Sequence, residues 1–169
     1  NVGTYRIEIK GPRKLGLFIN YLQGGRDHVE RNNRAGKPTP VAIVMGTDPV
    51  IGLVSVSRVQ ADMDELAVAG GLRGEAVQVV RCQTVDLEVP ATSEVVIEGI
   101  IRANELENEG PFGEYTGYMG PAAMSYVVDV TCITHRNRPI VQAFLSQMPP
   151  SESSCVRSIG RESTLFADP

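Results

Sequence analysis

The sequence predicts a mainly β (α+β) fold built from antiparallel strands, with one or two short helices. Many short segments alternate apolar and polar residues or are continuously apolar, and Gly, Pro or Asn residues separate them. Only two segments have the pattern of a helix, and both are short. Strands at this spacing with so few helices indicate an antiparallel barrel or sandwich.

Length, charge and cysteine content exclude several classes of protein. The 169 residues suit one domain, which at this length needs neither disulfides nor zinc to fold. With 16 basic and 20 acidic residues, the net charge of −4 argues against a nucleic-acid-binding protein. No apolar run approaches the roughly 18 residues of a membrane span. The three widely spaced cysteines favour the reducing cytoplasm over a disulfide framework.

The first half of the chain predicts strands and one surface helix. Residues 2–10 alternate, so that Arg6, Glu8 and Lys10 face one way and apolar residues face the other. A Gly-Pro turn leads to a returning strand over 15–21. The polar segment 27–35 is expected to form a short helix, and strands are expected over 41–45, where the apolar run fits burial on both faces, and 50–57.

The second half contains the best helix candidate and further strands. Residues 63–69 are expected to form a helix, with Asp62 as its N-cap, Glu65 completing a capping box and Gly70-Gly71 ending it. Further strands are expected over 76–81, 93–102, 125–134 and 140–145, the last two joined by a hairpin turn at 136–139.

The loop over residues 109–118 is the most unusual segment. It is rich in glycine yet holds Glu109, Glu114 and three aromatic rings. Aromatic rings around fixed carboxylates suit a water-excluding site of proton transfer. The alternative is a rigid glycine-proline turn with two exposed glutamates.

Two further residues have both a functional and a structural interpretation. Arg6 is a residue type that binds carboxylate or phosphate groups, but it can equally be a surface arginine paired with Glu8 on its own strand. Glu65 can be a ligand, but a capping-box glutamate needs no other role.

Four segments together resemble the UbiD family of prenylated-FMN-dependent decarboxylases. They are Asn-Val-Gly-Thr-Tyr-Arg at 1–6, Leu-Arg-Gly at 72–74, Asp-Leu-Glu-Val-Pro-Ala at 86–91, and the loop at 109–118. The resemblance covers nearly the whole chain. It implies the central cofactor-binding domain over residues 1–148, a split β-barrel similar to flavin reductases. Residues 149–169 would be a linker toward a C-terminal oligomerisation domain of a longer, homo-oligomeric protein.

The resemblance also implies an activity. Family members use prenylated FMN, with Mn²⁺ and K⁺ at its phosphate, for reversible non-oxidative decarboxylation of aromatic or α,β-unsaturated acids. A flavin prenyltransferase supplies the cofactor. Glu114 would be the proton donor, Arg6 would hold the substrate carboxylate, and Glu109 would orient Arg6. Neighbouring carboxylates can share a proton near neutral pH, which a general acid needs.

The implied ligands of the cofactor and its metals come mostly from the N-terminal segment. Asn1 and Glu65 match the ligands of the divalent metal, and both offer the hard oxygen donors that Mn²⁺ prefers. The residues that match flavin-lining, phosphate or potassium segments are Thr4, Tyr5, Arg6, Phe18, Ile19, Asn20, Gln23, Gly24 and Ser55. Many relatives have a basic residue just before the Gly-Gly pair. This chain has Leu22-Gln23 there, which leaves the third metal ligand open.

Two alternative functions remain at this stage. The chain can be a non-catalytic, UbiD-like subunit of a carboxylase complex. It can also be an FMN-binding module like a flavin reductase, although no nicotinamide-binding fingerprint is visible.

Overall fold

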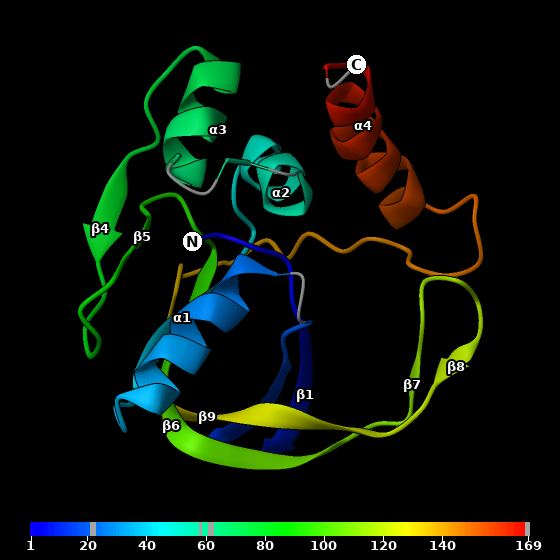
Figure 1. The fold of residues 1–169 in the computed structure, drawn as a ribbon. Coiled ribbons are helices and arrows are strands. Elements are labelled where there is room, and N and C mark those ends of the chain that lie inside the picture. Colours follow the sequence, from blue (N-terminus) through cyan, green and yellow to red (C-terminus); the bar gives the residue numbers. More distant parts are fainter. Residues whose placement is uncertain (21–22, 58, 61–62, 168–169) are drawn as a thin grey trace.

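A five-stranded antiparallel sheet organises the chain in the computed structural model, which describes residues 1–20, 23–57, 59–60 and 63–167 (Figure 1). The strands follow the order β1-β2-β9-β6-β3. Their bounds are β1 (Arg6–Gly11), β2 (Lys14–Phe18), β3 (Thr39–Met45), β6 (Val95–Glu109) and β9 (Ala123–His135). The described strands leave β1 and β3 as open edges. The mainly β, antiparallel architecture is therefore confirmed, whereas a closed or split barrel is not.

Two small hairpins extend from this sheet. Strands β4 (Val79–Arg81) and β5 (Glu88–Pro90) form one of them. Strands β7 (Phe112–Gly113) and β8 (Met119–Gly120) form the other, which lies on the opposite side of the molecule in Figure 1.

Helices lie on both sides of the N-terminal segment. Helix α1 (Gly24–Arg34) covers one face of the sheet, while α2 (Pro49–Val56), α3 (Glu65–Arg73) and α4 (Glu152–Ala167) gather above it (Figure 1). The N-terminal segment runs between the two groups. No helix among the described residues has both the length and the apolar character needed to cross a membrane.

The main core lies between α1 and the sheet. Val29 of α1 packs with side chains from three strands and from the residue just after β2, which are Leu15, Leu17, Ile19, Ile101, Tyr126 and Val128. Ile101 and Val128 are fully buried, and each such side chain contributes about 1.5–3 kcal/mol through removal from water. A second, smaller core of Ile51, Val54 and Ala69 joins α2 to α3. The core therefore fixes one face of the sheet and leaves the other face for polar groups.

The prediction of one or two helices was wrong, because the described residues form four. Residues 50–57 were expected to be a strand, but residues 50–56 belong to α2 and Ser57 is its C-cap. The Asp48 side chain accepts a hydrogen bond from Val50 N (3.0 Å), and Pro49 stands at the first helical position. These N-terminal signals outweigh the strand preference of an apolar, partly β-branched segment. Residues 152–167, inside the expected linker, form α4.

The predicted ends of α3 also differ from the structure. The helix starts at Glu65, and its N-cap is Asp64, whose side chain accepts from Leu66 N (2.8 Å). The capping-box role predicted for Glu65 is therefore wrong, and Asp62 lies outside the described residues. The helix continues through the Gly-Gly pair and ends before Gly74, which adopts a left-handed φ of 78°.

The expected strand over 140–145 was also wrong, and with it the hairpin at 136–139. The Ile140 amide donates to the Glu94 carboxylate (3.0 Å) rather than to a strand, and Phe144 is 54 % exposed. The other predicted strands are confirmed with shifted ends, and the predicted helix 27–35 corresponds to α1.

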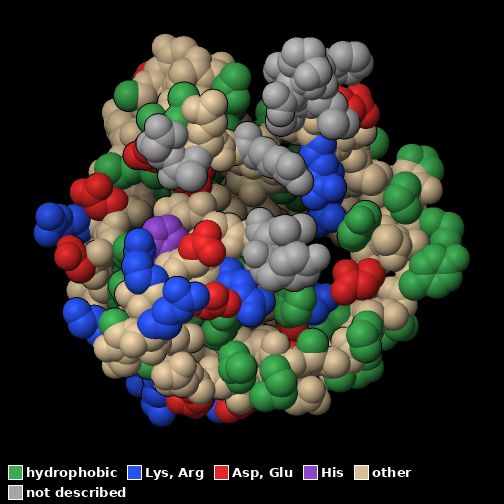
Figure 2. Space-filling model, in the orientation of Figure 1, with side chains coloured by type: hydrophobic (Ala, Val, Ile, Leu, Met, Phe, Trp, Pro, Cys, Tyr) green, Lys and Arg blue, Asp and Glu red, His purple; other side chains and the backbone are tan. Residues whose placement is uncertain are grey.

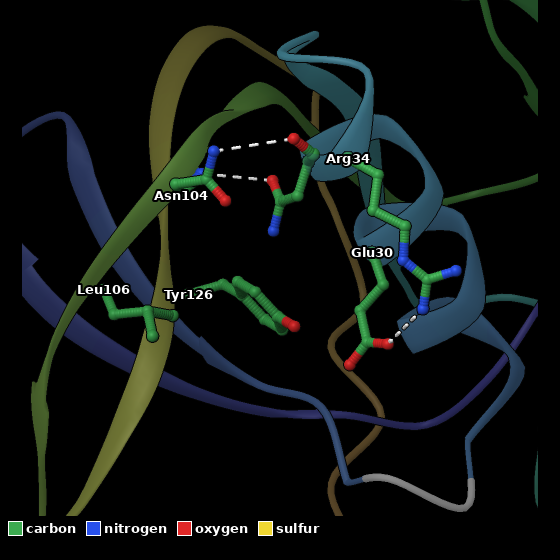
Figure 3. Close-up of a pocket in the computed structure, with 6 residues that line it drawn as sticks. Glu30, Arg34, Asn104, Leu106 and Tyr126 are labelled. Atoms are coloured by element: carbon green, nitrogen blue, oxygen red, sulfur yellow. Dashed lines mark hydrogen bonds and ion pairs between the residues drawn. The ribbon is translucent and has the colours of Figure 1, made fainter.

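A bend in the two longest strands shapes the sheet. The register of β6 and β9 shifts between Ile101 and Leu106, and Asn104 lies there with a φ of 60°. The Asn33 side chain of α1 accepts a hydrogen bond from Asn104 N (3.1 Å; Figure 3). This bend redirects the second half of β6.

Glu98 is a second buried polar anchor, because it is only 1 % exposed. Its carboxylate accepts from Gln83 N (2.8 Å), Thr84 N (2.6 Å) and Thr84 Oγ1 (2.6 Å). Burial raises the pKa of Glu98, but the hydrogen bonds from Thr84 and Gln83 outweigh burial and hold it below its usual value. Glu98 therefore fixes the β4–β5 connection to β6.

We expect Glu98→Gln to lower the free energy of unfolding by about 2–3 kcal/mol, since the amide nitrogen would face one of the two backbone N–H donors, that of Gln83 or that of Thr84. Urea unfolding at pH 7 measures this change, with exposed Glu88→Gln as the control. Because the pKa of Glu98 is lowered by folding, its stabilisation is present above its ordinary value of 4.5 and is lost as the pH falls through the lowered value. Equal stability of the two variants would contradict this account.

We expect Asn104→Val to destabilise the fold by about 1–3 kcal/mol, because a β-branched residue strongly disfavours a positive φ. Asn104→Gly keeps the backbone bond to Asn33 and tolerates that φ, so it should lose less. Urea unfolding of both variants tests the bend. Equal losses would show that the backbone conformation at residue 104 is unimportant.

Candidate active site

Arg6, at the start of β1, binds both glutamates of the loop singled out from the sequence. Its Nε donates to Glu109 Oε1 and its Nη2 to Glu109 Oε2, each at 3.1 Å, in a bidentate ion pair. Its Nη1 donates to Glu114 Oε1 at 2.5 Å. The structure therefore places the three predicted catalytic residues together, and the interpretation of Arg6 as a surface partner of Glu8 was wrong.

The two glutamates differ in exposure. The Glu109 side chain has no exposed surface, whereas that of Glu114 is 38 % exposed and that of Arg6 is 27 % exposed. The simpler interpretation of this loop, a turn with two exposed glutamates, is therefore wrong for Glu109. The hydrogen bond to Glu109 is the main cause that raises the pKa of Arg6, which is fully ionised at any physiological pH. Both carboxylates bind Arg6, but that of Glu109 is buried whereas that of Glu114 also reaches solvent.

Curvature of the sheet brings Arg6 and Glu109 together. Strands β1 and β6 are three positions apart, which in a flat sheet would separate them by about 14 Å. The bend in β6 and the length of the two side chains together bridge this separation. After Glu109, Gly110 adopts a φ of 78° and turns the chain into the β7–β8 hairpin, which carries Glu114 between its strands.

Two phenylalanines complete the surroundings of Arg6. Its guanidinium carbon lies 4.4 Å from the ring centre of Phe18 and 5.0 Å from that of Phe112. Such contacts are attractive and limit water around the cation. Phe18 was expected to line the flavin. Phe112 was not assigned a role, although its position between the two glutamates was a usable signal. Hydrophobic side chains also gather on the nearby hairpin face (Figure 2), where Tyr118 is 71 % exposed.

The two predicted metal ligands form a second cluster. Asn1 Nδ2 donates to Glu65 Oε1 at 2.6 Å, and the Tyr5 hydroxyl donates to Asn1 Oδ1 at 3.2 Å. Burial, together with the charge of Glu65, raises the pKa of Tyr5. The first residue of the chain is thus tied to the first turn of α3.

Asn1 and Glu65 fit a divalent cation that also binds phosphate. Both provide oxygen atoms, and Mg²⁺-like ions often take only one or two protein carboxylates alongside phosphate oxygens. Within the described ranges, no three His, Cys, Asp or Glu side chains are grouped to form a metal cage. The donor set therefore suits an ion that bridges protein to phosphate.

Most of the remaining predicted cofactor residues lie where the N-terminal segment meets the start of α1 and the end of α2. Gln23 joins two of them, because its Oε1 accepts from Asn20 N (2.8 Å) and its Nε2 donates to the Thr4 carbonyl (3.0 Å). Thr4 Oγ1 lies 2.6 Å from Ser55 Oγ of α2. The Gln23 amide oxygen is thus already engaged. Gly24, at the start of α1, lies against Asn1. The Ile19 side chain is buried in the core instead, so it does not reach this part of the structure.

A surface pocket lies away from these two clusters. A pocket of about 340 Å³ separates α1 from the bend of β6 (Figure 3). It is lined by Glu30, Asn33, Arg34, Asn104, Leu106 and Tyr126. None of the predicted site residues lines it, so the ionic cluster at Arg6, rather than this pocket, is the candidate active site.

Comparisons with known proteins identify the family of the chain. Residues 1–149 match the family model described as UbiD, 3-octaprenyl-4-hydroxybenzoate carboxy-lyase Rift-related domain. The chain is 36 % identical over 152 residues to a phenolic acid decarboxylase of Escherichia coli O157:H7, covering 90 % of this chain and 32 % of the relative. The chain therefore spans about a third of the length of that relative.

Solved structures show the same similarity. The UbiD-class enzyme HmfF from Pelotomaculum thermopropionicum, in complex with prFMN, superposes with a TM-score of 0.90 at 38 % identity, over 98 % of this chain and 38 % of that one. The closed form of vanillic acid decarboxylase from Sedimentibacter hydroxybenzoicus superposes with a TM-score of 0.87 at 32 % identity, over 91 % and 33 %. With the family model matched over residues 1–149, the chain belongs to the UbiD family.

Proposed function

We propose that this chain is the prenylated-FMN-binding domain, residues 1–148, of a decarboxylase that acts on aromatic or α,β-unsaturated carboxylic acids. The observation that carries the proposal is the single guanidinium of Arg6 shared between a buried and a half-exposed carboxylate. Relatives named as decarboxylases, and HmfF in complex with prFMN, support it.

Arg6 would bind and orient the substrate carboxylate. A guanidinium has five N–H donors, and the bonds to Glu109 and Glu114 use one on Nε and one on each terminal nitrogen. One N–H therefore remains on Nη1 and one on Nη2, enough for a carboxylate. Glu109 holds the guanidinium plane by its bidentate pair, while Phe18 and Phe112 limit water around it.

Glu114 would supply the proton that replaces CO₂. When bound, prenylated FMN would supply an electron sink for the pair released as the bond between carbon and carboxylate breaks and CO₂ leaves. Glu114 would then donate its proton to that carbon, which takes back the electron pair to form the new C–H bond. Because its side chain is part exposed, it can regain a proton from solvent. The same groups acting in reverse would support carboxylation, so the reaction is proposed to be reversible.

Asn1 and Glu65 would hold Mn²⁺ against the cofactor phosphate, with K⁺ bound near Ser55. Thr4, Tyr5, Phe18, Ile19, Asn20, Gln23 and Gly24 would line the cofactor. A flavin prenyltransferase would supply that cofactor in the cytoplasm. Residues 149–169 would lead to an oligomerisation domain, and the complete protein would be a homo-oligomer.

We expect Glu114→Gln to reduce decarboxylation by about 10²- to 10⁴-fold, the usual contribution of a positioned general acid, while cofactor binding is retained. CO₂ release by the full natural chain, after co-expression with a flavin prenyltransferase, measures this loss on a panel of aromatic and acrylic acids. Glu105→Gln, on β6, is the matched control. Unchanged turnover would refute the role of Glu114, and absent turnover in the parent protein would favour the non-catalytic subunit.

We expect Glu65→Gln to abolish stoichiometric Mn²⁺ binding and to weaken retention of the flavin, because the neutral amide lacks the charge that the cation needs. Native mass spectrometry of the co-expressed protein measures both. Glu75→Gln, just beyond α3, serves as the control. Full Mn²⁺ occupancy in the Glu65→Gln variant would remove this residue from the metal site.

A further inference from the structure

Three cations of β1 and β2 reach three successive residues of β6. Arg6 binds the Glu109 carboxylate, Lys10 Nζ donates to the Asn108 carbonyl at 2.5 Å, and Lys14 binds the Glu107 carboxylate. These contacts cross the polar face of the sheet, opposite the apolar face that packs on α1. They connect strands that are not neighbours in the sheet.

Lys10 makes the central contact and is the least exposed of the three cations, at 13 % of its side chain. It also pairs with Glu8 Oε2 at 2.9 Å. Glu8 lies two residues from Arg6 on the same face of β1, and Asn108 directly precedes Glu109. Lys10 therefore ties the strand that carries Arg6 to the backbone beside Glu109.

The path of Lys10 depends on Gly16, which stands opposite Glu8 in the register of β1 and β2. A Cβ at position 16 would lie 2.7 Å from Lys10 Cε, so any larger residue would displace the lysine. Glu8 Oε2 is buried and has no hydrogen-bond partner among the described atoms, which leaves the Lys10 ammonium to balance its charge. The Lys10 side chain is therefore held in one conformation by its surroundings and does not rotate freely.

We propose that Lys10 is a positioning residue for the Arg6–Glu109 pair. By binding the Asn108 carbonyl, Lys10 sets the distance between β6 and β1 so that both Glu109 oxygens meet the guanidinium. A bidentate pair needs two parallel hydrogen bonds, and a displacement of about 1 Å in such a site can cost up to about a hundredfold in rate. The effect on turnover rests on the proposed function, whereas the effect on the ion pair does not.

The first test is turnover of Lys10→Met, which keeps the length of the side chain but removes the ammonium. In the full natural chain loaded with cofactor, we expect kcat to fall by about 10- to 100-fold while KM changes by less than about twofold. Lys10→Arg, which can still donate to the Asn108 carbonyl and balance the charge of Glu8, should restore most of the rate. Lys14→Met, which removes a cation from the same face but from a more exposed ion pair, should stay within about twofold of the parent.

Gly16→Ala provides a variant that retains every charge. Because the clash falls on the flexible end of Lys10, the fold should survive while the ammonium is displaced. We expect its kcat to fall in the same direction as that of Lys10→Met. Parent-like kcat in both variants, or an equal loss in Lys14→Met, would overturn the proposal.

A second readout requires no activity. The Arg6 Nε–H resonance, assigned by its loss in Arg6→Lys, should be visible and protected from exchange in the parent because it is bonded to buried Glu109. We expect fast exchange in Lys10→Met and renewed protection in Lys10→Arg. Unchanged protection in Lys10→Met would overturn the positioning role. If the parent decarboxylates no acid but these shifts occur, the proposed function fails and the role of Lys10 stands.

Discussion

The ion pair between Arg6 and the fully buried carboxylate of Glu109 depends on the curvature of the sheet. Removing an ionised carboxylate from water without a partner is far more costly than the total stability of a domain permits. The partner, however, lies three strands away. The bend at Asn104, the turn at Gly110 and the contact from Lys10 to the Asn108 carbonyl all help to bring β6 toward β1.

The division of the sheet into an apolar and a polar face allows the fold to bury these charged side chains and remain stable. One face is apolar and packs on α1, so it supplies the hydrophobic burial that folding needs. The other face can then hold charges that pair with one another. At its edge, the N-terminal segment connects the sheet to α2 and α3 through Thr4–Ser55 and Asn1–Glu65. In the proposed function, one short segment therefore serves both purposes, with Asn1 near the cofactor phosphate at one end and Arg6 near the substrate carboxylate at the other.

The sequence predicted the antiparallel strands and the three acidic and basic residues of the site, because strand alternation and the glycine-rich loop are local patterns and the resemblance links them. It did not predict α2, since Val50, Ile51 and Val54 favour a strand when read alone. The decisive signal there was the Asp48-Pro49 start of a helix. The contacts of Lys10 and Phe112 with the site could not be predicted, because they depend on curvature between segments about a hundred residues apart.

The ion pair between Arg6 and Glu109 joins residues separated by 103 positions. At translation rates of about 5–20 residues per second, roughly 5–20 s pass between the synthesis of the two side chains. During that interval β1 and β2 exist without β9 and β6, which arrive last and must insert beside an early hairpin. Such non-local pairing is slow to form. The site is thus assembled only after nearly the whole domain has left the ribosome, so the nascent chain carries an unpaired Arg6 and the exposed edge of its first hairpin until that point.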